Sequence, residues 1–293
     1  MSADEEHLAT RRAAGLFDFS FMGLYEFSGS SELQCLQTRD LKEIKPGQIA
    51  YTLLLKEDGA ALVDATVWCM EAERFWLFTG RRGGYGGRDR SGEYAILAVQ
   101  GPASGRILAR LIGADSVLAL KYFRFVERQG LIVARLGYSG ELGYELLAPA
   151  AGAAGLRQRV LEEGEGDGLR ECGWTAADSL RIEAGYVLFD REVDGRANPR
   201  ELGLERLLST PRDFAVRRRL VGLEILERPA QPGLPLAQVT SECLSPSLGR
   251  RLALGFAAER AAGEVRLADG RLARLASLPF YDPDKARPRA APL

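Results

Sequence analysis

The chain has 293 residues, of which 46% are hydrophobic and 27% charged, a composition typical of folded globular proteins rather than disordered chains. Its 39 basic and 40 acidic residues leave a formal net charge of −1, so no overall positive field favours a nucleic acid or an anionic membrane as a partner. A chain of this length usually folds as two domains, or as one domain with an appendage.

The polar N-terminal segment 1–14 is predicted to be a flexible arm, and it carries the only histidine, His7. Outside this segment, the chain has no histidine for a mechanism that needs a buried imidazole, which excludes serine–histidine hydrolases and histidine-rich metal sites. The four cysteines lie far apart without a C-x-x-C pair, which predicts reduced structural thiols and no metal centre. The sequence has neither a signal peptide nor an apolar run of membrane-spanning length, which predicts a cytoplasmic protein.

Alternating apolar residues and turn signals predict the elements of the first third of the chain. The spacing of Ser31 and Gln34 is that of a capping box, which predicts the start of a short helix. The glycine- and arginine-rich stretch 81–92 predicts a mobile loop, whose arginines also suit a phosphate or a polyglutamate tail. Strands are predicted over 16–27, 49–55, 61–70 and 74–80, and the later ones form an antiparallel meander.

The remaining chain shows two textures. Helical spacing and short apolar runs alternate up to about residue 185, with predicted strands over 94–100, 118–126 and 131–138 and predicted helices over 103–113, 156–163 and 176–184. From about Arg217, short apolar runs are separated by glycine and proline, which predicts a small antiparallel β-barrel as a second domain. The last residues are predicted to fray.

Asp64 interrupts an otherwise apolar strand, where an ionised carboxylate is costly unless it is paired or used. Alternation along the strand places Asp64 on a mixed face with Thr66 and Trp68, while Val63 and Ala65 face the other way. Such a carboxylate orients a ligand amine or stabilises positive charge. The structural alternative is an aspartate that accepts hydrogen bonds from backbone donors.

The segment GYSGELGYE, residues 137–145, combines three glycines with two carboxylates four residues apart. Glycine lets the backbone turn tightly and approach a ligand, and a carboxylate there accepts two parallel N–H bonds from an amino-amidine edge such as that of a pterin or purine. The alternative is a solvated surface turn. Ser139 is no nucleophile, because no histidine serves it.

The segment AADSLRIEAGY, residues 176–186, interleaves charged and apolar residues. Asp178 and Arg181 are three residues apart, so they pair on one face of a helix. A structural salt bridge is the favoured interpretation of this spacing.

Together these segments resemble the aminomethyltransferase family, the T-protein of the glycine cleavage system and its folate-binding relatives. LFDFSFMG is similar to that family's G-[LM]-F-D-[VL]-S-H-M, GAALVDATV to G-G-x-x-D-D-x-x-V, and LGYSGELGYEL to R-[TC]-G-Y-[TS]-G-E-D-G-[FVY]-E. AADSLRIEAGYVLF is similar to A-R-D-x-L-R-x-E-A-G-x-x-L-[YF]. Several long motifs in the same order, from about Gly15 to Asp282, make a chance match improbable.

The resemblance implies an α+β fold, with a folate-binding body of two interleaved α/β lobes and a C-terminal antiparallel β-barrel. We accordingly expect a folate-binding domain over 15–212, a barrel over 216–282 and a tail over 283–293. The implied activity is transfer of an aminomethyl or methyl one-carbon unit to tetrahydrofolate. The implied donor is a small molecule or the lipoyl group of an H-protein-like carrier, with release of ammonia when the unit is aminomethyl.

The resemblance also assigns roles to matching residues. Asp64 is the implied catalytic carboxylate beside the reactive folate nitrogens, and Glu145 grips the amino-amidine edge of the pterin. Tyr51 and Met22 match positions that line the folate cavity, and Tyr138 supports the loop. Glu141, the other carboxylate of that loop, joins them as a predicted folate-binding residue.

The chain departs from the family pattern at several positions. Val63 replaces the first aspartate of the family's pair, Phe21 replaces the histidine of S-H-M, and Ala177 stands where the family has an arginine near the pterin. Segments expected to wall the cavity are also shorter. These departures support an alternative, a non-catalytic folate-binding scaffold or regulatory protein of the same family.

Overall fold

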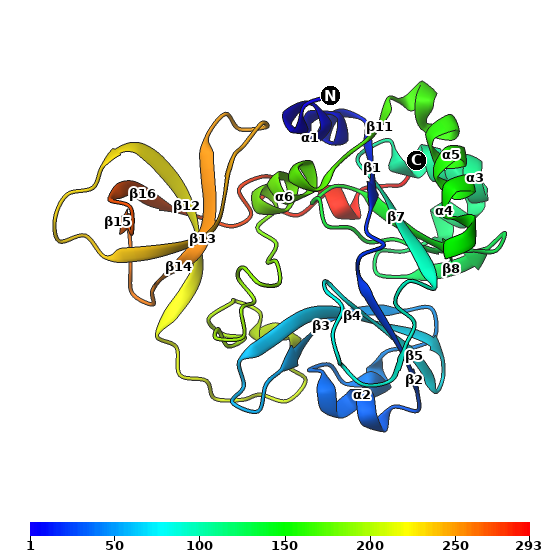
Figure 1. Cartoon of the computed structure of the whole chain (residues 1–293), viewed down its shortest axis with the longest axis horizontal. Helices are drawn as coiled ribbons and strands as arrows, with labels where there is room; N and C mark the ends of the chain where they lie inside the picture. The colour runs from blue at the N-terminus through cyan, green and yellow to red at the C-terminus, as the bar shows by residue number, and fades with distance from the viewer.

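The computed structural model describes all 293 residues and has a mixed α/β fold. Two β-sheets form the body of the protein, and a third set of strands follows them at the C-terminal end of the chain (Figure 1). The helices that flank these sheets are α1 (Ala3–Arg12), α2 (Ser31–Leu36), α3 (Ser104–Ile112), α4 (Ala114–Ala119), α5 (Ala153–Gly164) and α6 (Trp174–Glu183). No helix is long and apolar enough to cross a lipid bilayer.

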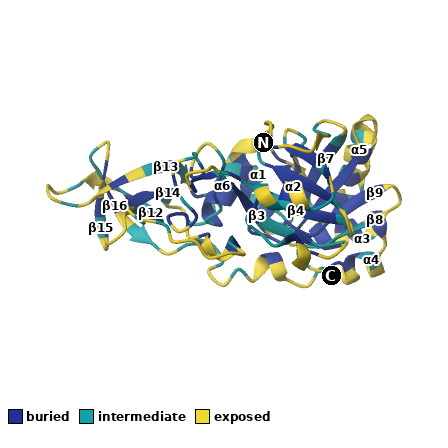
Figure 2. Cartoon of the chain, turned by 90° about the horizontal axis from the view of Figure 1, so that it is seen from below, coloured by how far each residue is buried: buried dark blue, intermediate teal, exposed yellow.

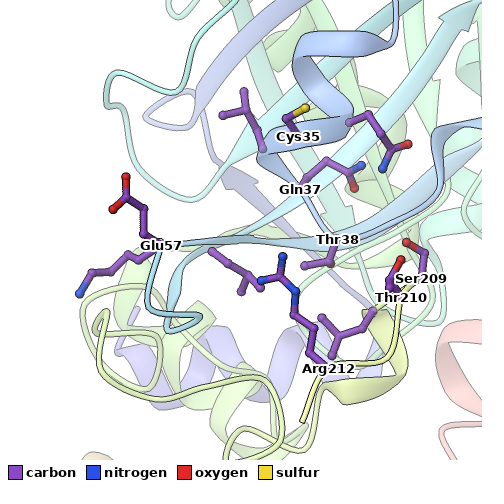
Figure 3. A pocket seen from close by; sticks show the side chains of 12 residues that line it. Cys35, Gln37, Thr38, Glu57, Ser209, Thr210 and Arg212 are labelled. Atoms are coloured by element: carbon purple, nitrogen blue, oxygen red, sulfur yellow. The ribbon is translucent and has the colours of Figure 1, made fainter. Parts of the chain in front are cut away.

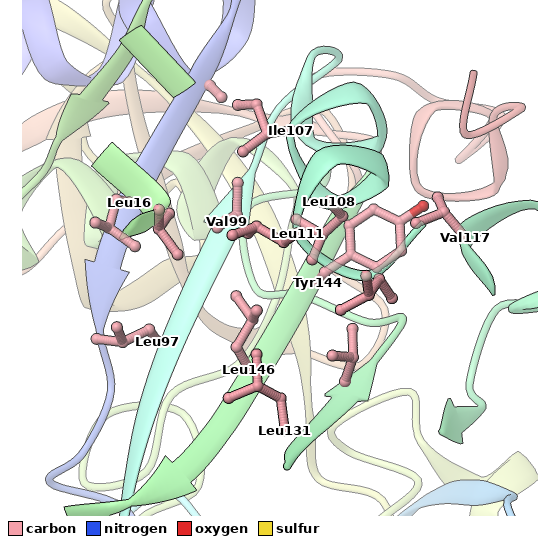
Figure 4. Close-up of a cluster of buried hydrophobic side chains, with 14 of the residues drawn as sticks. Leu16, Leu97, Val99, Ile107, Leu108, Leu111, Val117, Leu131, Tyr144 and Leu146 are labelled. Carbon is pink, nitrogen blue, oxygen red and sulfur yellow. The ribbon is translucent and has the colours of Figure 1, made fainter. Parts of the chain in front are cut away.

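The first sheet has six strands, and α3, α4 and α5 cover one of its faces (Figure 1). Its core is a cluster of 20 buried residues in which Leu97, Val99, Tyr144 and Leu146 from the strands meet Ile107 and its neighbours from α3 (Figure 4). Burying this much apolar surface is the main force holding helices and sheet together. The strands, in spatial order, are β11 (Leu169–Glu171), β1 (Ala14–Asp18), β7 (Tyr94–Gln100), β10 (Gly143–Pro149), β9 (Leu131–Ala134) and β8 (Phe125–Arg128).

The second sheet has five strands and contains the predicted antiparallel meander, which is confirmed. Along β4, Val63, Ala65 and Val67 join one buried cluster, whereas Trp68 joins another. The predicted alternation of this strand is therefore confirmed. The strands, in spatial order, are β3 (Ile49–Leu55), β4 (Ala61–Glu71), β5 (Arg74–Thr79), β2 (Gly23–Ser28) and β6 (Arg88–Asp89).

A second apolar cluster joins the two sheets of the body. It combines Trp68, Trp76 and Phe78 of the five-stranded sheet with Ala98 and Ile132 of the six-stranded sheet. The two sheets thus share a core, and a cavity between them is walled by strands on both sides.

The C-terminal strands are paired in a ring, in the order β12 (Arg218–Pro229), β14 (Arg251–Ala258), β13 (Leu236–Leu244), β15 (Glu264–Leu267) and β16 (Arg271–Ala276), with β16 returning to β12. The sequence predicted an entirely antiparallel set, but β13 and β15 pair in parallel. Helix α6 contacts both β13 and β14, which brings this part of the molecule against the body.

The predicted flexible arm is wrong, because most of segment 1–14 forms α1. Ser2 caps the helix in a capping box with Glu5, and His7, Thr10 and Arg11 are buried. The predicted frayed tail is also partly ordered: it carries a short 3-10 helix, Arg287–Arg289, and the carbonyl of Ala290 accepts a 2.6 Å hydrogen bond from Arg135. Figure 2 shows exposed residues on turns and on the outward faces of helices.

Three further elements differ from their prediction. The stretch 16–27 is split between β1 and β2, which belong to different sheets, and 118–126 contains the end of α4 before β8 begins. Helix α2 starts as predicted, but Ser30 is its N-cap and makes no side-chain capping bond. The side chain of Gln34 binds the carbonyl of Arg39 instead, because the chain folds back over the helix.

Candidate functional site

A small, mainly apolar cavity of about 150 Å³ lies between the two sheets of the body. Twelve of its 17 lining residues are hydrophobic. Five of the residues predicted from the sequence line it together: Met22, Tyr51, Asp64, Tyr138 and Glu145. The structure thus gathers residues that are up to 123 positions apart in the chain into one site.

Asp64 and Tyr51 come from neighbouring strands of the five-stranded sheet. Leu53 faces Asp64 in the register and Tyr51 faces Thr66, so the two polar side chains are diagonal neighbours on one face. The Tyr51 hydroxyl donates a 3.0 Å hydrogen bond to Oδ2 of Asp64. Burial raises the pKa of Asp64 to about 6, although the Tyr51 hydrogen bond opposes this shift. Asp64 is therefore mostly ionised at neutral pH, with a pKa close enough to exchange a proton.

Glu145 approaches the cavity from the six-stranded sheet. On the two strands that flank β10, Glu145 pairs with Ala98 of β7 and Ala134 of β9. Their small side chains leave space beside the carboxyl group. Glu145 is only 7% exposed, and its side chain makes no hydrogen bond within the protein. Burial alone raises the pKa of Glu145 to about 7. A buried carboxyl group without a partner is costly, which makes Glu145 a candidate to accept hydrogen bonds from a ligand.

Tyr138 and Met22 complete the predicted lining. The Tyr138 hydroxyl donates a 2.6 Å hydrogen bond to the carbonyl of Val187, so it supports the adjoining chain segment. The preceding Gly137 is required by close packing, because a Cβ there would lie 1.9 Å from Oε1 of Gln100. This glycine packs the loop against β7 and also lines the cavity, and its predicted role in the close approach of a ligand stays a prediction.

Glu141 is the one predicted binding residue that the cavity does not include. Its carboxylate is buried in an ion pair with Arg11, at 3.0 Å, and lies 3.3 Å from Arg287. Burial raises the pKa of Glu141 while both arginines oppose the shift. Its partners come from α1 and the C-terminal tail, both predicted from the sequence to be flexible, and its contact with folate stays a prediction.

Aromatic residues that the sequence analysis did not select form the mouth of the site. Phe21 and Trp174 are each 43% exposed and meet edge to face, with ring centroids 5.5 Å apart. A second cavity of about 410 Å³ adjoins the first, and five residues line both: Phe19, Phe21, Trp174, Leu188 and Phe189. Exposed aromatic side chains are the signal that would have identified this mouth.

Of the departures from the family pattern, Phe21 lines both cavities, whereas Val63 and Ala177 lie outside their lining. Val63 faces the opposite side of β4, within an apolar cluster, so an aspartate there would not reach the site by this face. Ala177 is buried inside α6 and lines neither cavity. The predicted pair of Asp178 and Arg181 is present, at 2.7 Å, as a structural salt bridge.

A larger groove of about 420 Å³ lies elsewhere, between α2, the β3–β4 turn and the segment 208–212 (Figure 3). Its buried polar side chains are already partnered: the Gln37 carbonyl oxygen accepts from Thr52, and the Thr38 hydroxyl lies 3.1 Å from the same threonine hydroxyl. The groove contains none of the residues predicted to carry function.

Known proteins are similar to this chain in sequence and in fold. Aminomethyltransferases from Symbiobacterium thermophilum and Geobacillus kaustophilus are 33% and 34% identical, covering 96% of this chain in each case and 89% and 90% of their own lengths. The crystal structure of glycine cleavage system aminomethyltransferase T from Bartonella henselae superposes with a TM-score of 0.80 at 26% identity, over 96% of this chain and 90% of that one. The model of the GCVT N-terminal domain matches residues 1–85 and 86–212. The chain therefore belongs to the GCVT, or glycine cleavage T-protein, family.

Proposed function

We propose that this protein is an aminomethyltransferase that transfers a one-carbon unit to tetrahydrofolate bound between the two sheets. The observation that carries the proposal is Glu145, a buried carboxyl group without a protein partner at the wall of an apolar cavity. The family and the names of its relatives supply the reaction type. In this proposal the two α/β lobes and the C-terminal barrel together form the folate-binding body.

Glu145 binds the pterin ring in this proposal. An ionised carboxylate accepts two parallel N–H bonds from a planar amino-amidine edge. The two bonds fix the orientation of the ring, and the carboxylate's charge strengthens them. The small Ala98 and Ala134 beside it give the ring room, and the apolar lining covers its faces. The 150 Å³ cavity suits the pterin alone, and the adjoining 410 Å³ cavity suits the remainder of the molecule.

Asp64 is the proposed catalytic group. Tetrahydrofolate supplies two secondary amine nitrogens, which form two C–N bonds to the one-carbon unit. The donor's C–N bond breaks to release ammonia and its C–S bond breaks to leave the carrier's dihydrolipoyl thiol, and these two leaving groups take up the two folate N–H protons. The Asp64 carboxylate stabilises positive charge that develops beside it, and its pKa of about 6 also suits it to accept a proton. Tyr51 holds this carboxylate by its 3.0 Å hydrogen bond.

The donor is proposed to be an aminomethyl group on a lipoyl carrier like the H-protein. It would reach Asp64 past the exposed Phe21 and Trp174. A cytoplasmic location stays a prediction.

Two measurements test this proposal. Calorimetric titration with tetrahydrofolate should show saturable binding, which Glu145→Ala weakens by at least tenfold. Turnover with an aminomethylated carrier should fall by two or more orders of magnitude in Asp64→Asn, while tetrahydrofolate still binds. Absence of wild-type binding at millimolar ligand would refute the proposal, and full activity of Asp64→Asn would remove the catalytic role of Asp64.

A further inference from the structure

A buried ion pair lies beside the segment Leu188–Phe189, which lines both cavities and is called the cavity wall below. Arg181 of α6 and Glu192 are both fully buried, and Nη1 of Arg181 lies 2.9 Å from Oε2 of Glu192. Burying two charges loses more solvation free energy than their attraction alone restores, unless further hydrogen bonds satisfy both groups. Here they do, and the partners come from separate parts of the molecule.

One set of partners is the backbone of the cavity wall. The carbonyl of Tyr186 accepts a 3.1 Å hydrogen bond from Arg181, and the amide of Leu188 donates a 2.9 Å bond to Glu192. Between them, the carbonyl of Val187 accepts the hydroxyl of Tyr138. Side chains thus hold the backbone of three successive residues, 186–188. The last of them, Leu188, and the next residue, Phe189, line both cavities.

The other set of partners belongs to strand β13 of the C-terminal ring. Nη2 of Arg181 donates a 2.6 Å bond to the Ser241 hydroxyl, which in turn donates a 2.7 Å bond to Oε1 of Glu192. The hydroxyl of Thr240 donates to the same carboxylate oxygen. The ion pair therefore connects the cavity wall to a strand that contributes no residue to either cavity.

We infer that Arg181 and Glu192 are positioning residues that hold the Leu188–Phe189 wall against bound tetrahydrofolate, and that Ser241 of β13 sets their geometry. The inference rests on the proposed function, because it concerns the same ligand. It assigns the C-terminal strands a role in ligand affinity through a defined chain of hydrogen bonds. It also makes Ser241 a determinant of binding without ligand contact.

Substitutions at β13 test the inference without altering the cavity lining. Ser241→Ala removes a donor to Glu192 and an acceptor for Arg181, and is expected to raise the dissociation constant for tetrahydrofolate about tenfold in calorimetry. The KM for tetrahydrofolate should rise by a similar factor with kcat within twofold. Ser241→Thr keeps the hydroxyl and should restore both values.

The matched control is the adjacent residue. Glu242 lies on the same strand as Ser241, and its carboxylate binds Arg251 of β14 and Arg271 of β16. Glu242→Gln should leave tetrahydrofolate binding unchanged. A second readout needs no ligand: quenching of Trp174 fluorescence by acrylamide should change in Ser241→Ala and not in Glu242→Gln. Thermal unfolding of each variant establishes that all are folded at the assay temperature.

The outcomes separate this inference from the proposed function. Binding by the wild type that is lost in Glu145→Ala but equal in Ser241→Ala and Glu242→Gln would overturn the inference and leave the function intact. No binding by the wild type, despite altered Trp174 quenching in Ser241→Ala, would overturn the proposed function. Equal loss of affinity in Ser241→Thr and Ser241→Ala would also overturn the inference, because the hydroxyl would not be responsible.

Discussion

The hydroxyl of Tyr51 donates a 3.0 Å hydrogen bond to Oδ2 of Asp64 across two antiparallel strands, at the side of a cavity that holds no other charge partner for this carboxylate. The bond favours the ionised form of Asp64 against the burial that disfavours it. Tyr51 thus adjusts the acidity of the proposed catalytic group as well as its orientation.

Replacing Tyr51 with phenylalanine is expected to raise the pKa of Asp64 further above about 6, because it removes the hydrogen bond that most strongly opposes the effect of burial. The acid limb of the kcat profile should move to higher pH by about one unit. Turnover measured from pH 5 to pH 9 checks this. Tyr138→Phe is the control, since its hydroxyl bonds Val187 and not Asp64, and its acid limb should not move. An unshifted limb in Tyr51→Phe would contradict the assignment of Asp64.

Tetrahydrofolate binding should strengthen as the pH rises through about 7. The pKa of Glu145 is raised to about 7 by burial, so the carboxyl group of the free protein is protonated below that pH and cannot accept two N–H bonds. Each pH unit below 7 should weaken binding up to tenfold. Calorimetric titrations at pH 6, 7 and 8 measure the slope, and Glu145→Gln should abolish it. A wild-type affinity that is independent of pH would show that the pterin does not use this carboxylate.

Glu145 should also lower the stability of the ligand-free protein. Its pKa is higher in the folded state, about 7, than the ordinary value of 4.5, so stability falls as the pH rises through that window. Glu145→Gln cannot ionise and should be more stable than the wild type at pH 8, by up to about 3 kcal/mol from a shift of this size. At pH 4.5 the difference should nearly vanish. Urea unfolding at both pH values measures it, and a destabilised variant at pH 8 would indicate that Glu145 already has a partner.

The sequence pattern predicts which way Asp64 faces because this residue lies within a regular strand, β4. The period of two along β4 separated Asp64 from Val63 correctly, and turn residues marked the ends of the meander. Periodicity did not place Glu145: it lies in β10, where the sequence predicts a glycine-rich turn, and the resemblance assigns its role. Local chemistry is enough where the element itself determines which way a side chain faces.

The N-terminal segment was predicted wrongly because its structure depends on distant partners. Its high polarity indicates a solvated arm, yet Nδ1 of His7 lies 2.7 Å from the hydroxyl of Ser179 and Arg11 binds Glu141. Those partners are more than 120 positions away in the chain, so no local pattern reveals them. The ion pairs of Glu141 are hidden from the sequence for the same reason: a carboxylate in a glycine-rich turn has the same sequence pattern whether it binds a ligand or an arginine.

Gly80 should control the position of Phe189. A Cβ at residue 80 would lie 2.3 Å from Cδ1 of the Phe189 ring, while the backbone there needs no positive φ. Gly80→Ala is therefore expected to displace the ring rather than strain the chain, and to weaken tetrahydrofolate binding several-fold. Gly84→Ala in the same loop has open space around its Cβ and is the control. Equal binding by both variants would show that the ring position does not matter.

Buried contacts attach α1 to the rest of the molecule. Glu183 is fully buried, with Nη2 of Arg11 at 2.8 Å and Nε2 of His7 at 3.1 Å. Burial by itself would raise the pKa of Glu183, but the His7 hydrogen bond and the Arg11 charge overcome it and lower the value to about 2. A carboxyl pKa below its ordinary value stabilises the fold above about pH 4.5, and this stability is lost as the pH falls towards 2.

Glu183→Gln should accordingly destabilise the protein at pH 7 by about 3 kcal/mol, because it removes the ion pair and leaves Arg11 with Glu141 alone. The deficit should shrink steadily between pH 4.5 and pH 2.5, where the wild type itself becomes protonated. Urea unfolding across this range measures the difference. Glu163→Gln, on the exposed side of α5, is the control and should unfold like the wild type at every pH. A constant deficit at all pH values would mean that Glu183 acts through shape and not charge, since the amide retains the volume of the carboxylate but not its titration.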